Sequence, residues 1–364
     1  MSWREERARF PVLERYAYLN AGTFGPLARE TLDAMAALRR WEGEHGRGGK
    51  EYFESMLERR ERVRALIASQ IHVPAEHLAL TDSTTQGVHV VIAGLELGPD
   101  DEVVTTDVEH FGLAGPLAAS GARLRIANVR GARATDLFDL IRAQVTPRAR
   151  LIATSAVSWL DGAIFPWREL RDATRVPVLV DGAQSVGALD VDATGADFYT
   201  VSAQKWLCGP DATGALFVAD PDRLPPRLVG YPGAASYDVA RGRWEPKPGA
   251  HRYDPLFAPA NSLVGLEAAL GNLPPGRFER ARELAERCRE LLAGAGHDVV
   301  TERGQSTLVS FRFDGDTAAA AAALYARGVV VRELPGTGLL RASVGWWNDE
   351  DDLERLVEGL AARR

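Results

Sequence analysis

Two charged side chains follow apolar runs of the kind that forms buried strands. Asp181 ends the run Val178–Val180, and Lys205 lies just beyond a second run that ends at Val201. Because the carboxyl ends of parallel strands meet at one edge of a sheet, we expect this carboxylate and this amine to lie close together. Pyridoxal-phosphate chemistry needs that pair, since a lysine forms the Schiff base and a carboxylate keeps the pyridine nitrogen protonated. A helix-capping aspartate and a solvated lysine are the alternative interpretation.

A hydroxyl-rich stretch points to an anion site. It consists of Ser83, Thr84 and Thr85. It precedes a helix expected over 88–97, and backbone N–H groups and hydroxyls that meet at a helix N-terminus bind phosphate. Three hydroxyls exceed what one helix cap requires, and Ser202 could add another. His110 follows the next strand, where its ring could lie over a planar ligand.

The runs that carry these residues alternate with helix-like stretches. Seven runs predict strands: Leu78–Leu80, Glu102–Thr106, Arg123–Ala127, Leu151–Ser155, Val178–Asp181, Phe198–Val201 and Gly214–Val218. Such alternation indicates a mainly parallel sheet with helices on both faces.

Helical stretches precede the sheet, and a smaller α/β pattern follows it. Helices are expected near Leu27–Trp41 and Lys50–Ser69, and a Pro- and Gly-rich passage follows residue 220. The tail predicts helices near Leu263–Gly271, Arg277–Leu292, Thr317–Arg327 and Asp349–Ala361, and strands near Thr307–Phe313, Val329–Glu333 and Leu339–Val344. We therefore expect an N-terminal segment, 1–25, a large domain, 26–255, and a small domain, 256–364.

Length and composition exclude several classes of protein. The 364 residues carry 43 Lys plus Arg against 50 Asp plus Glu, a net charge of −7 without a basic block, so a nucleic-acid partner is not expected. The charged N-terminus lacks a signal peptide's apolar stretch, and the alanine-rich run 317–326 is too short to span a membrane. Two cysteines are too few for a disulfide framework or a cysteine-based metal site. We expect a soluble cytoplasmic protein without a metal.

The motifs of other enzyme classes are missing or incomplete. No G-x-G-x-x-G follows a predicted strand, and Gly48-Gly49-Lys50 lacks the distal glycine and the hydroxyl of a P-loop. Gly182–Gly187 has one residue too many for the G-x-S-x-G elbow of hydrolases. The sequence therefore favours neither a nicotinamide enzyme, nor an NTPase, nor a serine hydrolase.

Further motifs accompany these residues along nearly the whole chain. They are Tyr18–Pro26, Ser83–Thr85, Glu109-His110, Asp181–Gln184, Ser202–Lys205, Leu340–Ser343 and Trp347–Glu350. With them the sequence resembles the class V aminotransferases of the fold-type I pyridoxal-phosphate enzymes. That family includes cysteine desulfurases, cysteine/cystine C–S lyases and isopenicillin-N epimerase-like proteins. The resemblance implies an α/β fold, with a mainly parallel seven-stranded sheet in the large domain and a small C-terminal α/β domain.

The resemblance also implies residue roles. Lys205, His110 and Asp181 would be catalytic: the lysine forms the Schiff base, the histidine stacks on the cofactor ring and the aspartate pairs with the ring nitrogen. Gln184 would contact the phenolic oxygen, and Arg341 the substrate carboxylate. Further cofactor contacts would come from Ser83, Thr84, Thr85, Ser202 and Gln204, and further substrate contacts from Asn20, Ala21 and Arg332. A solvated strand-end arginine is the alternative for Arg332. A homodimer is expected by analogy with the family.

Several positions depart from the family pattern. Gln204 replaces the histidine that usually precedes the lysine, and it can donate a hydrogen bond but carries no charge. His89 stands where the helix after the phosphate site often has asparagine. Leu160-Asp161 occupies the place of an Asn/Thr contact, and Ala258 that of a threonine that reaches the partner subunit's phosphate. These changes leave a catalytically degenerate binding or scaffold protein as an alternative from another class.

The stretch before Arg341 bears on the type of reaction. A desulfurase of this family needs a nucleophilic cysteine there, and residues 332–340 contain none. Neither Cys208 nor Cys288 substitutes straightforwardly. We therefore expect an enzyme that acts on a small amino acid by β-elimination, as a C–S lyase does, with transamination or epimerisation as the alternatives.

Overall fold

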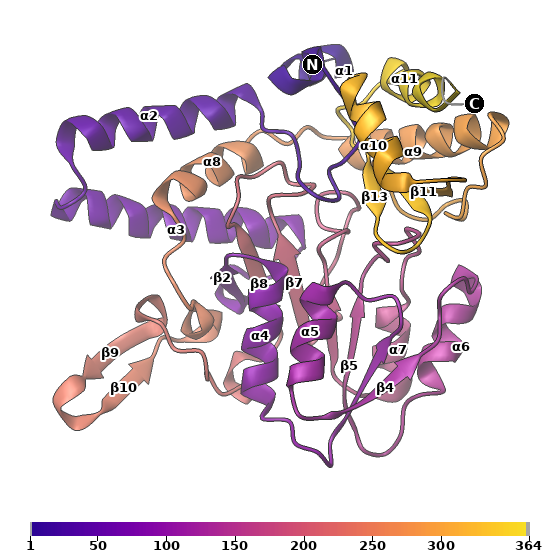
Figure 1. Ribbon diagram of the computed structural model, residues 1–364. Coiled ribbons are helices and arrows are strands. Elements are labelled where there is room, and N and C mark those ends of the chain that lie inside the picture. Colours follow the sequence, from indigo (N-terminus) through magenta and orange to yellow (C-terminus); the bar gives the residue numbers. More distant parts are fainter. Residues whose placement is uncertain (1, 362–364) are drawn as a thin grey trace.

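The computed structural model describes residues 2–361, and a seven-stranded sheet forms the larger part of it (Figure 1). The spatial order is β2-β8-β7-β6-β5-β3-β4. The strands are β2 (Leu78–Thr81), β3 (Glu102–Thr106), β4 (Arg123–Ala127), β5 (Ala149–Ser155), β6 (Val178–Asp181), β7 (Phe198–Ser202) and β8 (Gly214–Val218). All neighbours pair in parallel except β8, which is antiparallel to both β2 and β7. The predicted mainly parallel seven-stranded sheet is confirmed.

Successive residues of each strand face opposite helical layers, because side chains alternate along a strand. In β6, Val178 and Val180 pack in the core beneath α3 (Lys50–Gln70), α6 (Leu137–Arg142) and α7 (Trp167–Thr174). Leu179 faces the other core, beneath α4 (Thr84–Leu95) and α5 (Phe111–Ala119). Burial on both faces explains why Val178–Val180 is a continuous apolar run.

The N-terminal part crosses from one half of the molecule to the other. The short helix α1 (Trp3–Ala8) begins with a capping box between Ser2 and Glu5, and β1 (Ala17–Tyr18) pairs in parallel with β12 (Val329–Val330) of the C-terminal half. The helix α2 (Arg29–His45) then packs on α8 (Ala260–Leu270). The sequence predicted α2 and α3 but neither α1 nor β1.

The C-terminal half has a sheet and a core of its own, above the large sheet in Figure 1. Its antiparallel sheet has the order β11-β14-β13, from β11 (Leu308–Arg312), β14 (Leu339–Ser343) and β13 (Arg332–Leu334). Its helices are α9 (Arg277–Gly294), α10 (Thr317–Ala326) and α11 (Glu350–Ala361). The strand predicted over Val329–Glu333 is divided into β12 and β13, because β12 pairs with β1 and β13 with β14.

An exposed hairpin projects from the large half within the Pro- and Gly-rich passage (Figure 1). It consists of β9 (Ala234–Asp238) and β10 (Arg243–Pro246), joined through Gly242 at φ +60°. The sequence did not predict it, because no residue of either strand is buried and an apolar alternation is therefore missing. Within residues 2–361, no helix is both long and apolar enough to cross a membrane, and no cluster of His, Cys, Asp and Glu could hold a metal ion.

Candidate active site

The carboxyl ends of the central strands gather the predicted residues at one edge of the sheet. Asp181 and Ser202 are the last residues of β6 and β7, and Ser155 at the end of β5 is the register partner of Asp181. Lys205 follows β7 after two residues. This edge faces the C-terminal half (Figure 1), and the charges of Asp181 from one half and Arg341 from the other both act on Lys205.

Lys205 is the one lysine at this edge, since the other two lysines of the sequence, Lys50 and Lys247, lie on α3 and beside β10. Burial lowers the pKa of Lys205 to about 8; the negative charge of Asp181 opposes this shift and the positive charge of Arg341 adds to it. No hydrogen bond or ion pair joins its amine to another of residues 2–361. A larger fraction of this amine than of an ordinary lysine is therefore neutral, and nucleophilic, near neutral pH.

Asp181, the last residue of β6, and Gln184, on the loop that follows it, are both buried. Asp181 Oδ1 accepts the N–H of Ala183 at 2.9 Å, whereas Oδ2 makes no hydrogen bond to the described residues. Gln184 Oε1 accepts from Trp206 Nε1 at 3.0 Å, and Gln184 Nε2 donates to the Gly22 carbonyl at 2.9 Å. One carboxylate oxygen and one amide N–H are thus left for a ligand.

The hydroxyl-rich stretch forms the N-terminus of α4, which begins at Thr84, four residues before the predicted start. Ser83 is the N-cap, and its Oγ accepts the N–H of Gln86 at 3.2 Å. The amides of Thr84 and Thr85 point out of the first turn without a partner among the described residues. Ser202 lies close by, because its register partner Gly214 approaches Ser83: a Cβ on Gly214 would lie 3.0 Å from Ser83 N. This cup suits a phosphate.

His110 is the N-cap of α5, at the edge of the site. Its Nδ1 accepts the N–H of Gly112 at 3.1 Å, which places the proton of the neutral ring on Nε2. Burial and the neighbouring Lys205 charge lower the pKa of His110, so the ring is neutral at neutral pH. The edge of Trp159 lies against it, with ring centroids 5.3 Å apart.

Glu109 is a site residue to which the sequence analysis gave no role of its own. Its carboxyl accepts hydrogen bonds from Thr106 Oγ1 at 2.7 Å and from the N–H and hydroxyl of Ser155 at 2.9 and 2.5 Å. Burial, with the nearby charge of Asp181, raises its pKa to about 7 despite those bonds. It ties the loop that carries His110 to the end of β5. The only signal in the sequence is its place beside that histidine.

The C-terminal half contributes a buried cation. Arg341 of β14 is 2% exposed, no carboxylate of residues 2–361 lies within ion-pair distance of it, and its Nη1 donates to the Trp159 carbonyl at 2.7 Å. Burial lowers its pKa to about 9. Arg332 of β13 is its register partner and is exposed. A buried guanidinium without a counterion is costly unless an anionic ligand pairs with it.

The N-terminal segment lies against that arginine. Asn20 bridges to Ser343, Ala21 is buried, and a Cβ on Gly22 would lie 2.7 Å from Arg341 Nη2. The structure thus brings Asn20 and Ala21 beside Arg341, although neither side chain hydrogen-bonds to it.

The positions that depart from the family pattern have distinct surroundings. Gln204 Oε1 is buried without a partner among the described residues, so this side chain could still face a ligand. Leu160 is packed in the core, and Asp161 accepts the N–H of Ala163 within its own turn. Ala258 packs against the large core. His89 is exposed on α4.

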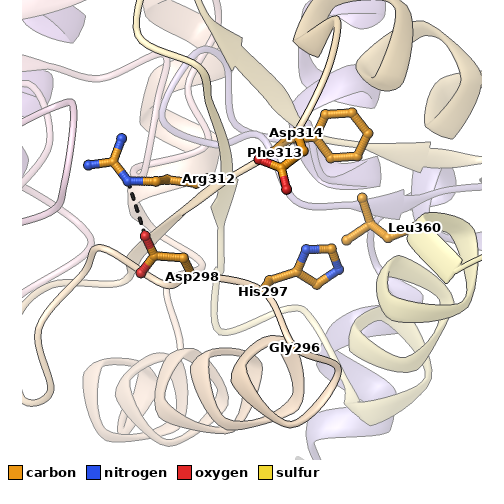
Figure 2. A pocket seen from close by; sticks show the side chains of 7 residues that line it. All are labelled: Gly296, His297, Asp298, Arg312, Phe313, Asp314 and Leu360. Atoms are coloured by element: carbon orange, nitrogen blue, oxygen red, sulfur yellow. Dashed lines mark ion pairs between the residues drawn. The ribbon is translucent and has the colours of Figure 1, made fainter. Parts of the chain in front are cut away.

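A separate hollow of about 410 Å³ lies in the C-terminal half (Figure 2). It is lined by Gly296, His297, Asp298, Arg312, Phe313, Asp314 and Leu360, and Arg312 pairs with Asp298 across it at 3.0 Å. None of these residues belongs to the predicted site. Both partners of the ion pair are largely exposed, so it adds little to stability.

Comparisons with known proteins show the family of this chain. The family model described as aminotransferase class-V matches residues 17–356. Isopenicillin N epimerase of Streptomyces clavuligerus is 28% identical, over 99% of this chain and 98% of its own, and a probable cysteine desulfurase of Pseudomonas aeruginosa is 30% identical, over 97% and 96%. The cystine C–S lyase C-DES, in complex with its reaction product cysteine persulfide, superposes with a TM-score of 0.89 at 25% identity, over 97% of this chain and 99% of that one.

A further C-DES structure, with glycine covalently linked to its PLP cofactor, also gives a TM-score of 0.89 at 25% identity over 98% of both chains. The residues found here fit that cofactor: an unpaired amine, a free carboxylate oxygen, open amides at a helix N-terminus and the orphaned Gln204 oxygen surround one edge of the sheet. The chain therefore belongs to the aminotransferase class-V family, and it is a pyridoxal-5'-phosphate-dependent enzyme.

Proposed function

We propose that this enzyme is a C–S lyase, which cleaves the Cβ–S bond of a sulfur-containing amino acid such as cystine. The observation that carries the proposal is the absence of a sulfur acceptor at the site. Residues 335–338, between β13 and β14, form a tight turn with two glycines at positive φ and no cysteine. Both thiols of the sequence, Cys208 and Cys288, are buried, and burial raises the pKa of each. Neither thiol is therefore available to accept sulfur as a protein persulfide.

The residues at the sheet edge can share the work of this reaction. The cofactor, when bound, supplies an electron sink. Lys205 holds it and then takes the proton from the substrate Cα with Nζ, whose lowered pKa suits a base at neutral pH. With the cofactor bound, Asp181 Oδ2 would accept the pyridinium N–H, Gln184 Nε2 would donate to the phenolic oxygen, and the neutral imidazole of His110 would lie against the ring. The α4 cup, with Ser202 and Gln204, holds the phosphate.

Arg341 holds the substrate α-carboxylate, since it is a buried cation without a counterion. Arg332, its partner across the strand pair, is placed to hold a second carboxylate. A substrate with a carboxylate at each end, as in cystine, would use both. Asn20 and Ala21 close this side of the site.

The test is an assay of products with cystine, cysteine and simple amino acids. Cleavage of cystine consumes one water and yields pyruvate, ammonia and cysteine persulfide, with the proton leaving Cα and the bonding electron pair leaving with sulfur. We expect those products at matching rates, without conversion of the cofactor to its amine form. Stoichiometric accumulation of the amine form, reversed by a keto acid, would instead identify a transaminase.

Epimerisation is the second candidate, because an isopenicillin N epimerase matches nearly the whole chain. Such a reaction needs the same removal of the Cα proton by Lys205 but returns it to the other face. Solvent deuterium would then enter Cα with inversion and without pyruvate. That outcome would contradict the lyase proposal and leave the roles of Lys205 and Asp181 intact.

The enzyme is further proposed to work as a homodimer. Large apolar side chains are exposed on and around the β9–β10 hairpin: Leu228, Val229, Tyr231, Tyr237, Val239 and Phe257. Clustered exposure of this kind is typical of an association surface. The hairpin projects from the body of the molecule (Figure 1), as a contact surface for a neighbouring subunit would.

A further inference from the structure

The amide of Gln184 is held at both of its ends. Trp206 Nε1 donates to Oε1 at 3.0 Å, and Nε2 donates to the Gly22 carbonyl at 2.9 Å. An indole N–H can only donate and a carbonyl oxygen can only accept. Only one of the two amide orientations therefore satisfies both contacts. Trp206 and Gln184 are both buried, so water cannot easily replace either bond.

This orientation decides what the amide offers to the cofactor. With Oε1 on Trp206, the second N–H of Nε2 remains free to donate. In the reversed orientation an oxygen would replace that N–H, and it would repel a negatively charged phenolic oxygen. The inference rests on the proposed contact between Gln184 and that oxygen.

The same chain of contacts extends to the substrate clamp. Gly22, whose carbonyl accepts from Gln184, has no room for a side chain, because a Cβ would lie 2.7 Å from Arg341 Nη2 and 2.8 Å from Ser343 Oγ. The next residues are fixed as well, since the Gly25 N–H donates to the Gln204 carbonyl at 2.8 Å. Trp206 itself lies in the apolar cluster that joins the two halves of the molecule.

We infer that Trp206 is a positioning residue, because its indole N–H fixes the orientation of the Gln184 amide. In that orientation Gln184 Nε2 donates one hydrogen bond to the cofactor and one to the Gly22 carbonyl. The second bond holds the N-terminal segment against Arg341. Trp206 touches neither cofactor nor substrate in this arrangement.

The test compares Trp206→Phe with Trp347→Phe in the full-length enzyme loaded with pyridoxal 5'-phosphate. Trp347 is a matched control, because it is equally buried in the same cluster and its Nε1 has no partner among the described residues. The readout is the pH midpoint of the absorption change of the lysine-bound cofactor. Loss of the donor leaves more charge on the phenolic oxygen, so Trp206→Phe should raise the midpoint by about one pH unit. Trp347→Phe should leave it unchanged.

A double-mutant cycle separates positioning from packing. Gln184→Ala should raise the midpoint as Trp206→Phe does, and Trp206→Phe should add no further shift in the Gln184→Ala background. An additive shift of the midpoint, or a Trp206→Phe midpoint equal to that of Trp347→Phe, would overturn this inference but not the proposed function. A wild-type enzyme without any lysine-bound cofactor band would overturn the proposed function first.

If the Trp206→Phe variant does not fold, an NMR measurement takes the place of the experiments that use it. In protein labelled with ¹⁵N at the indole nitrogens, Gln184→Ala should move one indole N–H resonance upfield, because it removes the acceptor of that N–H. Addition of pyridoxal 5'-phosphate to the wild type should move the same resonance. Indole resonances that all stay in place in both experiments would contradict the inference.

Discussion

Lys205 is the one lysine of the sequence that lies at the sheet edge. Lys205→Ala should abolish borohydride-trappable cofactor, whereas the Lys50→Ala/Lys247→Ala variant should retain it, since those two amines lie away from the sheet edge. Cofactor trapped in Lys205→Ala at the wild-type level would show that another group holds it.

The pKa of Lys205 gives this capture a pH dependence. Below about 8 the folded amine is mostly protonated and cannot attack, so the rate of cofactor capture should rise with pH through a midpoint near 8. Because Arg341 lowers that pKa, Arg341→Met should move the midpoint upward. Stopped-flow absorbance measures the midpoint in the wild type and in Arg341→Met. A wild-type midpoint near the usual pKa of lysine would refute the assignment of Lys205 as the capturing amine.

Arg341 should strengthen binding of the amino acid and lower the thermal stability of the cofactor-free protein. Arg341→Met removes charge-assisted hydrogen bonds worth about 1.5–3 kcal/mol, so KM for the amino acid should rise about 10- to 100-fold. The cofactor-free protein should nevertheless unfold at a higher temperature, because a buried cation without a counterion is replaced by an apolar chain. Arg312→Met, on the neighbouring strand but largely exposed, is the control and should change neither quantity. A lower Tm in Arg341→Met would contradict this account.

At the scale of elements, the phosphate cup depends on the close approach of β8 to α4. In Gly214→Ala the new Cβ would lie 2.6 Å from the Val201 carbonyl and 3.0 Å from Ser83 N, and it would displace the N-terminus of α4. We expect the dissociation constant of pyridoxal 5'-phosphate to rise at least about 10-fold, the equivalent of about 1.4 kcal/mol. Gly98→Ala meets open space and should bind normally. Equal affinities, measured by equilibrium dialysis, would exclude a contact between this cup and the phosphate.

At the scale of the whole molecule, the β9–β10 hairpin should mediate assembly. Val239 at its tip is 82% exposed. Val239→Asp should convert a dimer to a monomer in light scattering and lower activity, because a buried charge in an interface is costly. Tyr325→Asp, exposed on α10, serves as the control and should stay dimeric. A wild-type monomer with full activity would remove the dimer from the proposal.

The proposed division at residues 25 and 255 also belongs to this scale. The C-terminal half encloses a core of its own, but β1 completes its pairing from the far end of the chain. Residues 17–19 therefore pack with the C-terminal half, and the division at residues 25 and 255 stays a prediction.

The sequence by itself determined the large sheet and the residues at its edge. The central strands β6 and β7 are buried along their whole length and appear as largely apolar runs; Asp181 and Ser202 end these strands, and Lys205 follows β7 after two residues. Local pattern and chain adjacency are sufficient to place these three groups together. The start of α4 was predicted too late, because its first turn is polar and faces the site instead of the core.

Only the tertiary structure decided the surroundings of these groups. Arg341 reaches the site from the other half of the molecule, Glu109 lies near Asp181, and Trp206 bonds to Gln184 across 22 positions of the chain. The charge states of Lys205 and Glu109 follow from burial between elements that are distant in sequence, and no local periodicity records such contacts. The sequence likewise did not predict the hairpin of β9 and β10, because an element that packs on no core carries no hydrophobic pattern.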